Sequence, residues 1–228
     1  MSVDLSVVVP AYNEEARLPP TLARVQEFLA TSGLTHEIVV VDDGSRDGTV
    51  RVAEAAGVTV LGGEPNRGKG YAVRRGMLAA RGTRRLMTDA DLSTPMEDLT
   101  SLMAKLDEGF DVAIASRALA GSKVEVHQPW YRENMGRVFN FVVRTLLLPD
   151  LHDTQCGFKL FTADATEKAF GPARLDGFSF DVEVLYLARR AGLKIAEVPV
   201  TWRNDEATRV RAMQGAKAFL DVLRIRMR

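Results

Sequence analysis

Residues 37–45 read EIVVVDDGS and decide the fold of the chain. The apolar run from 38 to 41 has no polar residue at alternate positions, which is typical of a strand buried on both faces of a parallel sheet. Two aspartates and a glycine close the run, and a helical stretch begins at Asp47. A buried strand, a polar turn and a helix in this order predict one unit of an α/β fold.

The same alternation extends to both sides of this unit. Strands are predicted at 5–9, 58–61, 84–88 and 112–115, and helices at 18–29, 47–56, 70–80 and 95–107. The first 117 residues therefore predict an open, doubly wound, mostly parallel sheet that is flanked by helices.

The second half of the chain is less regular. We expect a flexible loop at 118–128, a short strand or turn at 158–161, a strand at 195–198, and helices at 130–148, 180–190 and 208–228. No internal repeat, linker or low-complexity segment separates the halves. Residues 1–228 are therefore predicted to form one domain, with 1–117 as one half and 118–228 as the other.

The composition is that of an ordinary globular protein, with 46% hydrophobic and 26% charged residues. Thirty basic residues balance thirty acidic ones, so net charge gives no reason to expect a nucleic-acid partner. The single cysteine, Cys156, cannot form an intrachain disulfide, and the N-terminus lacks the pattern of a signal peptide. No apolar run approaches the roughly 20 residues of a membrane-spanning helix. We therefore expect a cytoplasmic protein.

Asp89 and Asp91 follow the predicted strand at 84–88. Two carboxylates two residues apart on an extended segment point the same way, so they can share one hard cation such as Mg²⁺ or Mn²⁺. The alternative is a pair of solvated turn residues. Such pairs are common as turn residues, but a position at the end of a strand strengthens the case for a cation site, because ligands of doubly wound sheets bind at the carboxyl ends of the strands.

Asp42 and Asp43 close the predicted strand at 37–41. A carboxylate there can accept hydrogen bonds from a nucleobase imino group or from ribose hydroxyls. The alternative is a helix cap, for which Asp47 or Ser45 is the better candidate. Neither a dinucleotide-binding glycine motif nor a P-loop is present. Residues 66–70, NRGKG, fit either a phosphate cradle or a glycine turn with exposed cations.

Several motifs together resemble the family 2 glycosyltransferases of the GT-A fold. In the first half these are VVVPAYNE at 7–14, VDDGSRDGT at 41–49, NRGKG at 66–70 and DAD at 89–91. In the second half, SRA at 116–118, DTQCGFKLF at 153–161, FDVE at 180–183 and AEVPV at 196–200 are similar to the dolichyl-phosphate β-glucosyltransferase branch. The resemblance implies inverting transfer of glucose from UDP-glucose to a polyprenyl phosphate. It assigns 1–117 to the nucleotide sugar and 118–228 to the acceptor.

The resemblance also implies roles for single residues. Those expected to bind the nucleotide sugar are Pro10, Tyr12, Glu14, Asp42, Asp43, Lys69 and Asp89. Tyr12 would lie against the base and Asp43 at its edge, while Asp89 and Asp91 would hold the Mg²⁺ or Mn²⁺ ion.

The residues expected to act in catalysis are Asp91, Arg117, Asp153 and Asp181. Arg117 would grip the acceptor phosphate, supplemented by Lys159 or Arg209, unless it pairs with a neighbouring aspartate. Asp153 and Asp181 are candidate bases, and Asp181 could instead cap a helix. A phosphate monoester is already anionic at neutral pH, so a base is scarcely needed.

The predicted helix at 208–228 bears on membranes. It has six basic residues against one acidic residue, and its apolar residues recur at three- and four-residue spacing, at Met213, Ala216, Leu220, Leu223 and Met227. Such a helix can lie on an anionic bilayer, or it can pack on the sheet. We expect peripheral contact at the cytoplasmic face of a membrane, without the N-terminal anchor of the eukaryotic branch or the C-terminal spanning helices of many bacterial relatives.

Two other functions remain open from the sequence. The same fold and donor could serve a soluble acceptor, or the chain could be an inactive module that binds nucleotide sugars or docks on membranes. The presence of both Asp89 and Asp91 argues against the inactive module.

Overall fold

The computed structural model describes residues 3–126, 130–203 and 213–227, with the side chains of 131–133 and 213–217 left out. The strands are β1 (Leu5–Ala11), β2 (His36–Asp42), β3 (Thr59–Leu61), β4 (Arg84–Thr88), β5 (Val112–Ser116), β6 (Lys123–Val126), β7 (Phe158–Thr162), β8 (Ile195–Pro199) and β9 (Thr201–Arg203). The helices are α1 (Leu18–Ser32), α2 (Thr49–Ala55), α3 (Lys69–Ala79), the 3₁₀ turn η1 (Met96–Asp98), α4 (Leu99–Asp107), α5 (Trp130–Leu146), α6 (Ala163–Phe170), α7 (Phe180–Arg190) and α8 (Met213–Arg226).

Seven of the described strands form one large, mostly parallel sheet, as predicted. Its order is β3-β2-β1-β4-β7-β5-β8. Strands β1 to β4 run parallel to their neighbours among themselves, and β5 is parallel to β8. Strand β7 lies antiparallel between β4 and β5. The apolar run at 158–161 is therefore a central strand.

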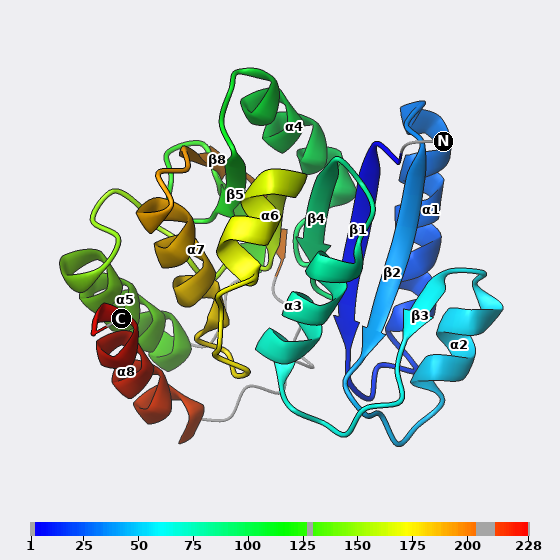
Figure 1. Ribbon diagram of the computed structural model, residues 1–228, viewed down its shortest axis with the longest axis horizontal. Helices are drawn as coiled ribbons and strands as arrows, with labels where there is room; N and C mark the ends of the chain where they lie inside the picture. Colours follow the sequence, from blue (N-terminus) through cyan, green and yellow to red (C-terminus); the bar gives the residue numbers. More distant parts are fainter. Residues whose placement is uncertain (1–2, 127–129, 204–212, 228) are drawn as a thin grey trace.

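Helices cover both faces of this sheet and bury two cores (Figure 1). Val7 and Val40 face the core that includes residues of α1, α2 and α4. Val8 and Val41 point the other way, into the core shared with α3 and α5 to α8. Because successive side chains of a strand alternate between faces, both positions must be apolar. This explains the unbroken hydrophobic run in residues 38–41.

Two sequence expectations need correction. The loop predicted at 118–128 contains β6, which pairs in parallel with β9 as a second, two-stranded sheet. Val126 and its acidic and basic neighbours in β6 are largely exposed, so the segment lacks the hydrophobic pattern of a buried strand. Helix α6 was not predicted, although the Thr162 hydroxyl accepts a hydrogen bond from the Ala165 N–H as an N-cap does.

The polar residues singled out in the sequence gather at one edge of the large sheet. This edge is formed by the carboxyl ends of β1, β2, β4 and β5 and by the amino end of antiparallel β7, where Phe158 pairs with Thr88. None of the helices in the described ranges is both long and apolar enough to span a membrane.

Candidate active site

The acidic turn after β4 is the centre of the site. Lys69 Nζ lies 2.6 Å from Asp89 Oδ1, and Asp91 Oδ1 accepts a hydrogen bond from the Ser93 N–H at 3.0 Å. A Cβ atom on Gly157 would lie 2.1 Å from Asp89 Oδ2, so a side chain at this position would displace the carboxylate from where it lies. The chain therefore places both carboxylates of the DAD motif at the edge of the sheet, with a lysine beside them.

The charges of this turn are coupled. Burial raises the pKa of Asp91, and the neighbouring Asp89 carboxylate raises it further, while the Ser93 N–H and Lys69 act in the opposite direction. Burial lowers the pKa of Lys69, but Asp89, Asp181 and Asp91 outweigh it and the net direction is upward. Lys69 is therefore cationic at neutral pH and offsets part of the negative charge.

The donor set of the acidic turn fits a divalent cation bound together with a substrate. Within the described residues, no group of three or more His, Cys, Asp or Glu side chains is placed to hold a metal. Mg²⁺-type ions in phosphate-transfer sites are held by one or two carboxylates, with substrate phosphates and water completing the shell. Asp89 and Asp91 match this arrangement, so the predicted metal role is compatible with the structure.

Asp43 and Asp42 lie at the end of β2 and are both buried. The two oxygens of Asp43 accept the N–H groups of Arg67 and Gly68, each at 2.9 Å. Asp42 accepts the N–H groups of Gly44 and Ser45 at 3.2 Å. Burial raises the pKa of Asp43, although these backbone hydrogen bonds lower it. Asp43 thus anchors the loop before α3, and its contact with a base stays a prediction.

The glycine-rich segment at 66–70 is a clamped loop rather than an open phosphate cradle. The N–H groups of Gly70 and Tyr71 at the start of α3 donate to the carbonyl oxygen of Asp176 at 2.8 and 3.3 Å. The Asp176 carboxylate pairs with Arg67 at 3.0 Å and with Arg74 at 2.8 Å. The first-turn amides, which would bind a phosphate in a cradle, already have an acceptor. Within this segment, Lys69 provides the contact with the acidic turn.

Tyr12, Glu14 and Pro10 lie at or near the end of β1. Tyr12 is 40% exposed, a high value for an aromatic residue next to a buried strand. Glu14 forms a two-point ion pair with Arg17 at 2.6 Å, and Pro10 pairs in register with Val41. The Tyr12 ring therefore offers an exposed surface on which a base could stack, while Glu14 has an internal partner. Their roles in nucleotide binding stay predictions.

Arg117, after β5, forms a two-point ion pair with Asp153. Arg117 Nε lies 2.6 Å from Oδ2 and Nη2 lies 2.8 Å from Oδ1. Although burial opposes it, Arg117 holds the pKa of the buried Asp153 below its usual value. Asp153 is therefore a weak base and a partner of Arg117. The Nε–Nη2 edge is engaged, so an acceptor phosphate would meet the other edge of the guanidinium.

Lys159 and Asp181 form a second ion pair below the site. Lys159 is fully buried, and its Nζ donates to Asp181 and, at 2.6 Å, to the carbonyl oxygen of Cys156. The sequence predicts that Lys159 or Arg209 supplements Arg117 on the acceptor. Lys159 is too deeply buried for this role, and Arg209 lies outside the described residues. Burial raises the pKa of Asp181, against the effect of Lys159 and Lys69. Burial also raises the pKa of the Cys156 thiol to about 11, so it stays protonated.

Some residues of the site were missed in the sequence. Glu183 is buried and accepts the N–H groups of Arg174 and Leu175 at 2.9 and 2.7 Å, which fixes the loop that clamps α3. Trp202 on β9 lies against Arg117, with 5.2 Å between the guanidinium carbon and the ring centroid. A glutamate in the first turn of a predicted helix was a usable signal for Glu183. Nothing local indicated Trp202, because its partner lies 85 positions earlier in the chain.

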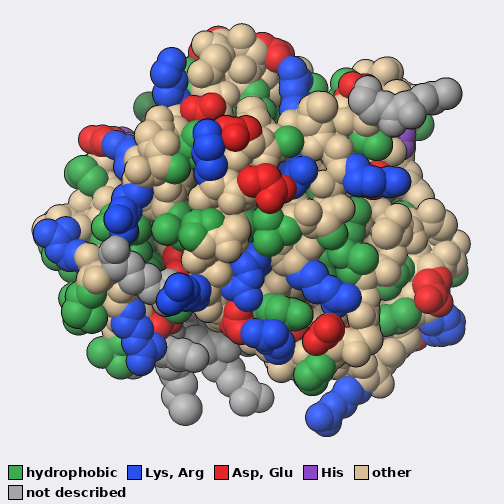
Figure 2. All heavy atoms as spheres, viewed as in Figure 1, with side chains coloured by type: hydrophobic (Ala, Val, Ile, Leu, Met, Phe, Trp, Pro, Cys, Tyr) green, Lys and Arg blue, Asp and Glu red, His purple; other side chains and the backbone are tan. Residues whose placement is uncertain are grey.

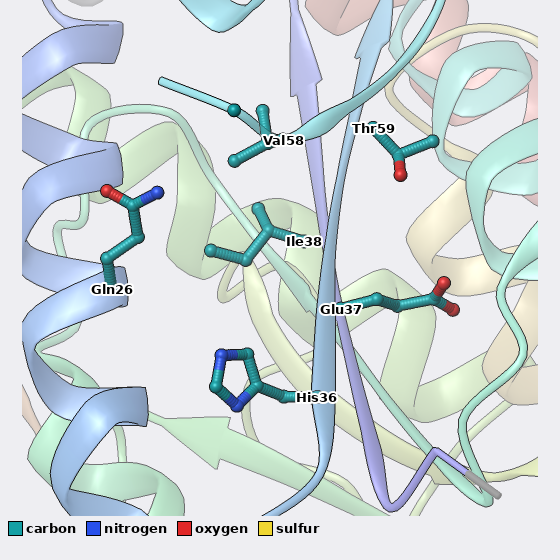
Figure 3. A pocket seen from close by; sticks show the side chains of 7 residues that line it. Gln26, His36, Glu37, Ile38, Val58 and Thr59 are labelled. Atoms are coloured by element: carbon teal, nitrogen blue, oxygen red, sulfur yellow. The ribbon is translucent and has the colours of Figure 1, made fainter. Parts of the chain in front are cut away.

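Two shallow hollows lie on the surface of the described residues. One of about 280 Å³ lies at the amino end of β2, the opposite end from Asp42, and is lined by Gln26, His36, Glu37, Ile38, Gly57, Val58 and Thr59 (Figure 3). The other, about 270 Å³, is lined by Asp91, Leu92 and residues of α1 and the turn before it. The second hollow therefore adjoins the acidic turn, whereas the first contains none of the predicted site residues.

Relatives share this chain's sequence over most of its length. Dolichyl-phosphate beta-glucosyltransferase of Drosophila melanogaster is 40% identical over 229 residues, covering 92% of this chain and 70% of that protein. The Homo sapiens protein of the same name is 36% identical over 224 residues, covering 90% and 69%.

Solved structures share the fold. Mycobacterium tuberculosis glucosyl-3-phosphoglycerate synthase matches with a TM-score of 0.75 at 22% identity, over 98% of this chain and 80% of that one. Its complex with Mn²⁺ and UDP-glucose matches with a TM-score of 0.73 at 22% identity, over 98% and 79%. These likenesses confirm the predicted GT-A fold. The model of the family described as "Glycosyl transferase family 2" matches residues 6–170, and the chain belongs to this family of glycosyltransferases.

Proposed function

We propose that the protein transfers glucose from UDP-glucose to a polyprenyl phosphate, with inversion at the anomeric carbon and with Mg²⁺ or Mn²⁺ held by Asp89 and Asp91. One observation carries the proposal: the acidic turn and the Arg117–Asp153 pair lie at the same edge of the sheet. The first suits a metal-bound diphosphate and the second an anionic acceptor. The names of the relatives supply the donor sugar and the lipid.

The chemistry follows from these positions. An acceptor phosphate oxygen attacks the anomeric carbon from the side opposite UDP, and the bond to UDP breaks with its electron pair leaving on the diphosphate. The metal, when bound, would neutralise charge on the leaving diphosphate. Lys69 adds a fixed cation on that side. Because the acceptor is already anionic, Arg117 has to orient it and no side chain has to deprotonate it.

A UDP-release assay tests the proposed acceptor. With UDP-glucose and Mn²⁺, a short, water-soluble prenyl phosphate should speed UDP release by at least about tenfold, since a positioned acceptor replaces slow attack by water. The matched control is the prenyl alcohol, which lacks the phosphate. Acceleration by a soluble phosphate such as 3-phosphoglycerate, but not by prenyl phosphate, would assign a soluble acceptor. UDP binding without turnover on either acceptor would favour the inactive module.

We further propose that helices α5 and α8 dock on an anionic bilayer. The two helices pack side by side, with the rings of Phe139 and Phe219 5.5 Å apart (Figure 1). Large apolar side chains of this pair are nevertheless exposed, among them Trp130, Phe141, Leu220 and Leu223. Monomeric proteins seldom leave such residues together on one surface without a partner.

The charge of this helix pair favours a lipid partner. Exposed arginines lie among the apolar residues, at 144 on α5 and at 224 and 226 on α8, and basic and hydrophobic side chains intermix at this edge in Figure 2. The whole chain has zero net charge, so the positive charge is local. Exposed tryptophan and interleaved cations are typical of surfaces that lie in the headgroup region. Of the six basic residues in the predicted helix at 208–228, Arg209, Arg211 and Arg228 lie outside the described residues. The cytoplasmic location stays a prediction.

Vesicle co-sedimentation tests this surface. The double variant Leu220→Ser/Leu223→Ser should bind anionic vesicles at least about tenfold more weakly, because each leucine contributes apolar area worth roughly 1.5–3 kcal/mol when fully buried. Leu78→Ser, a similar change at the partly exposed end of α3, is the control and should bind normally. Binding by the wild type should fall at high salt. Dimerisation that the double variant abolishes, without any vesicle binding, would assign the surface to a second copy.

A further inference from the structure

Arg117 is held from two directions. Asp153 engages the Nε–Nη2 edge of its guanidinium, and the ring of Trp202 lies 5.2 Å from its central carbon. This distance is within the range of about 6 Å at which a cation is attracted to an aromatic face. Trp202 is only 8% exposed, so neighbouring side chains hold the ring in place. The carboxylate fixes one edge of the guanidinium, and the indole lies close to its central carbon.

The strand that carries Trp202 is attached to the acidic turn. The N–H of Arg203 donates to the carbonyl oxygen of Ser93 at 2.9 Å, and the Ser93 N–H donates to Asp91 at 3.0 Å. On the other side of the tryptophan, the N–H of Thr201 donates to Asp98 at 2.9 Å. Strand β9 therefore connects the segment that follows Asp91 to the arginine at the end of β5.

We propose that Trp202 is a positioning residue. It orients Arg117 toward the acceptor phosphate and, because β9 is bonded to the segment after Asp91, it also fixes the position of Arg117 relative to the acidic turn. The inference rests on the proposed function, since it takes Arg117 as the group that meets the acceptor. The two-point ion pair fixes the guanidinium relative to the Asp153 carboxylate, but it leaves the two groups able to move together. The indole, whose centroid lies 5.2 Å from the guanidinium carbon, restricts that movement on its side, so the remaining N–H groups are directed toward the acceptor.

Kinetics with aromatic and aliphatic replacements test the role. Trp202→Phe keeps a ring and should stay within about threefold of the wild type. Trp202→Leu keeps an apolar side chain but removes the ring, and it should raise the KM for a water-soluble prenyl phosphate about tenfold. The Kd for UDP with Mn²⁺ should not change in either variant. Phe28→Leu, an aromatic-to-leucine change toward the end of α1 that lies away from this edge of the sheet, is the matched control and should behave as the wild type.

A purely structural role would give a different pattern. The leucine and phenylalanine variants would then lose activity in proportion to their loss of thermal stability, and UDP affinity would fall with it. Equal KM values for the acceptor in the leucine variant and the wild type would also overturn the inference about Trp202. The proposed function would still hold if the acceptor stimulates turnover by the wild type.

A double-mutant cycle measures, from thermal stability alone, the interaction between Trp202 and Arg117. Thermal unfolding of Trp202→Leu, Arg117→Lys and the double variant should show coupling, with the tryptophan change costing less when the guanidinium is absent. Strict additivity would overturn the positioning role even if prenyl phosphate proves to be the acceptor. If the two changes are coupled but prenyl phosphate does not accelerate UDP release, the contact between Trp202 and Arg117 is supported and the proposed acceptor is wrong.

Discussion

Replacement of Asp91 by asparagine is expected to lower turnover by about a hundredfold or more. The side chain keeps its size and can still accept the Ser93 N–H, but it loses the charge that would hold a divalent ion against the departing diphosphate. Asp107→Asn is the matched control. That carboxylate is 60% exposed and pairs with Arg84 at the amino end of β4, the opposite end of that strand from the turn, so turnover should be unchanged.

Calorimetry separates this role from a general loss of folding. UDP should bind the wild type more tightly with Mn²⁺ than with EDTA, and the asparagine variant should lose most of that difference while unfolding at a similar temperature. Equal UDP affinity with and without the metal in the wild type would contradict the role given to Asp89 and Asp91.

Replacement of Lys159 by methionine is expected to lower the free energy of unfolding by about 3–5 kcal/mol. The change leaves Asp181 buried without its cation, and such an unpaired charge is costly. The double variant Lys159→Met/Asp181→Leu should recover most of the loss, because an apolar pair can replace a buried ion pair at little cost. Lys168→Met, which breaks an exposed pair on α6, should change stability by less than about 1 kcal/mol.

The pH dependence of the single variant gives an independent check. Burial already raises the pKa of Asp181, and loss of Lys159 should raise it further above the unfolded value of about 3.9. The folded variant then binds a proton that the unfolded chain releases, so its stability rises as pH falls through the folded pKa. Urea denaturation should show a smaller deficit at pH 5 than at pH 8. A deficit that is the same at both values would mean that lost packing, and not the carboxylate, dominates.

Local sequence was sufficient to predict where the polar residues lie. Asp42 ends a buried strand, Asp43, Asp89 and Arg117 each follow one directly, and parallel strands bring their carboxyl ends to one edge. The ion-pair partners of these and neighbouring charged residues could not be predicted, because they come from segments far apart in the chain. Asp176 binds Arg67 and Arg74 from about a hundred residues away, and Lys159 turned out to be buried with Asp181. A lysine in a run of apolar residues was the only local sign of that burial.

The antiparallel position of β7 has a consequence for how the chain can fold. Strands β4 and β5 are not neighbours, since β7 lies between them and pairs with both. During synthesis, β5 therefore cannot pair with the rest of the sheet until residues 158–162 have been made and form β7. Pairing over such sequence separations raises contact order and slows folding. We infer that a fragment ending at residue 117 exposes the open side of β4 as an aggregation-prone edge, so the two halves are inseparable as folding units.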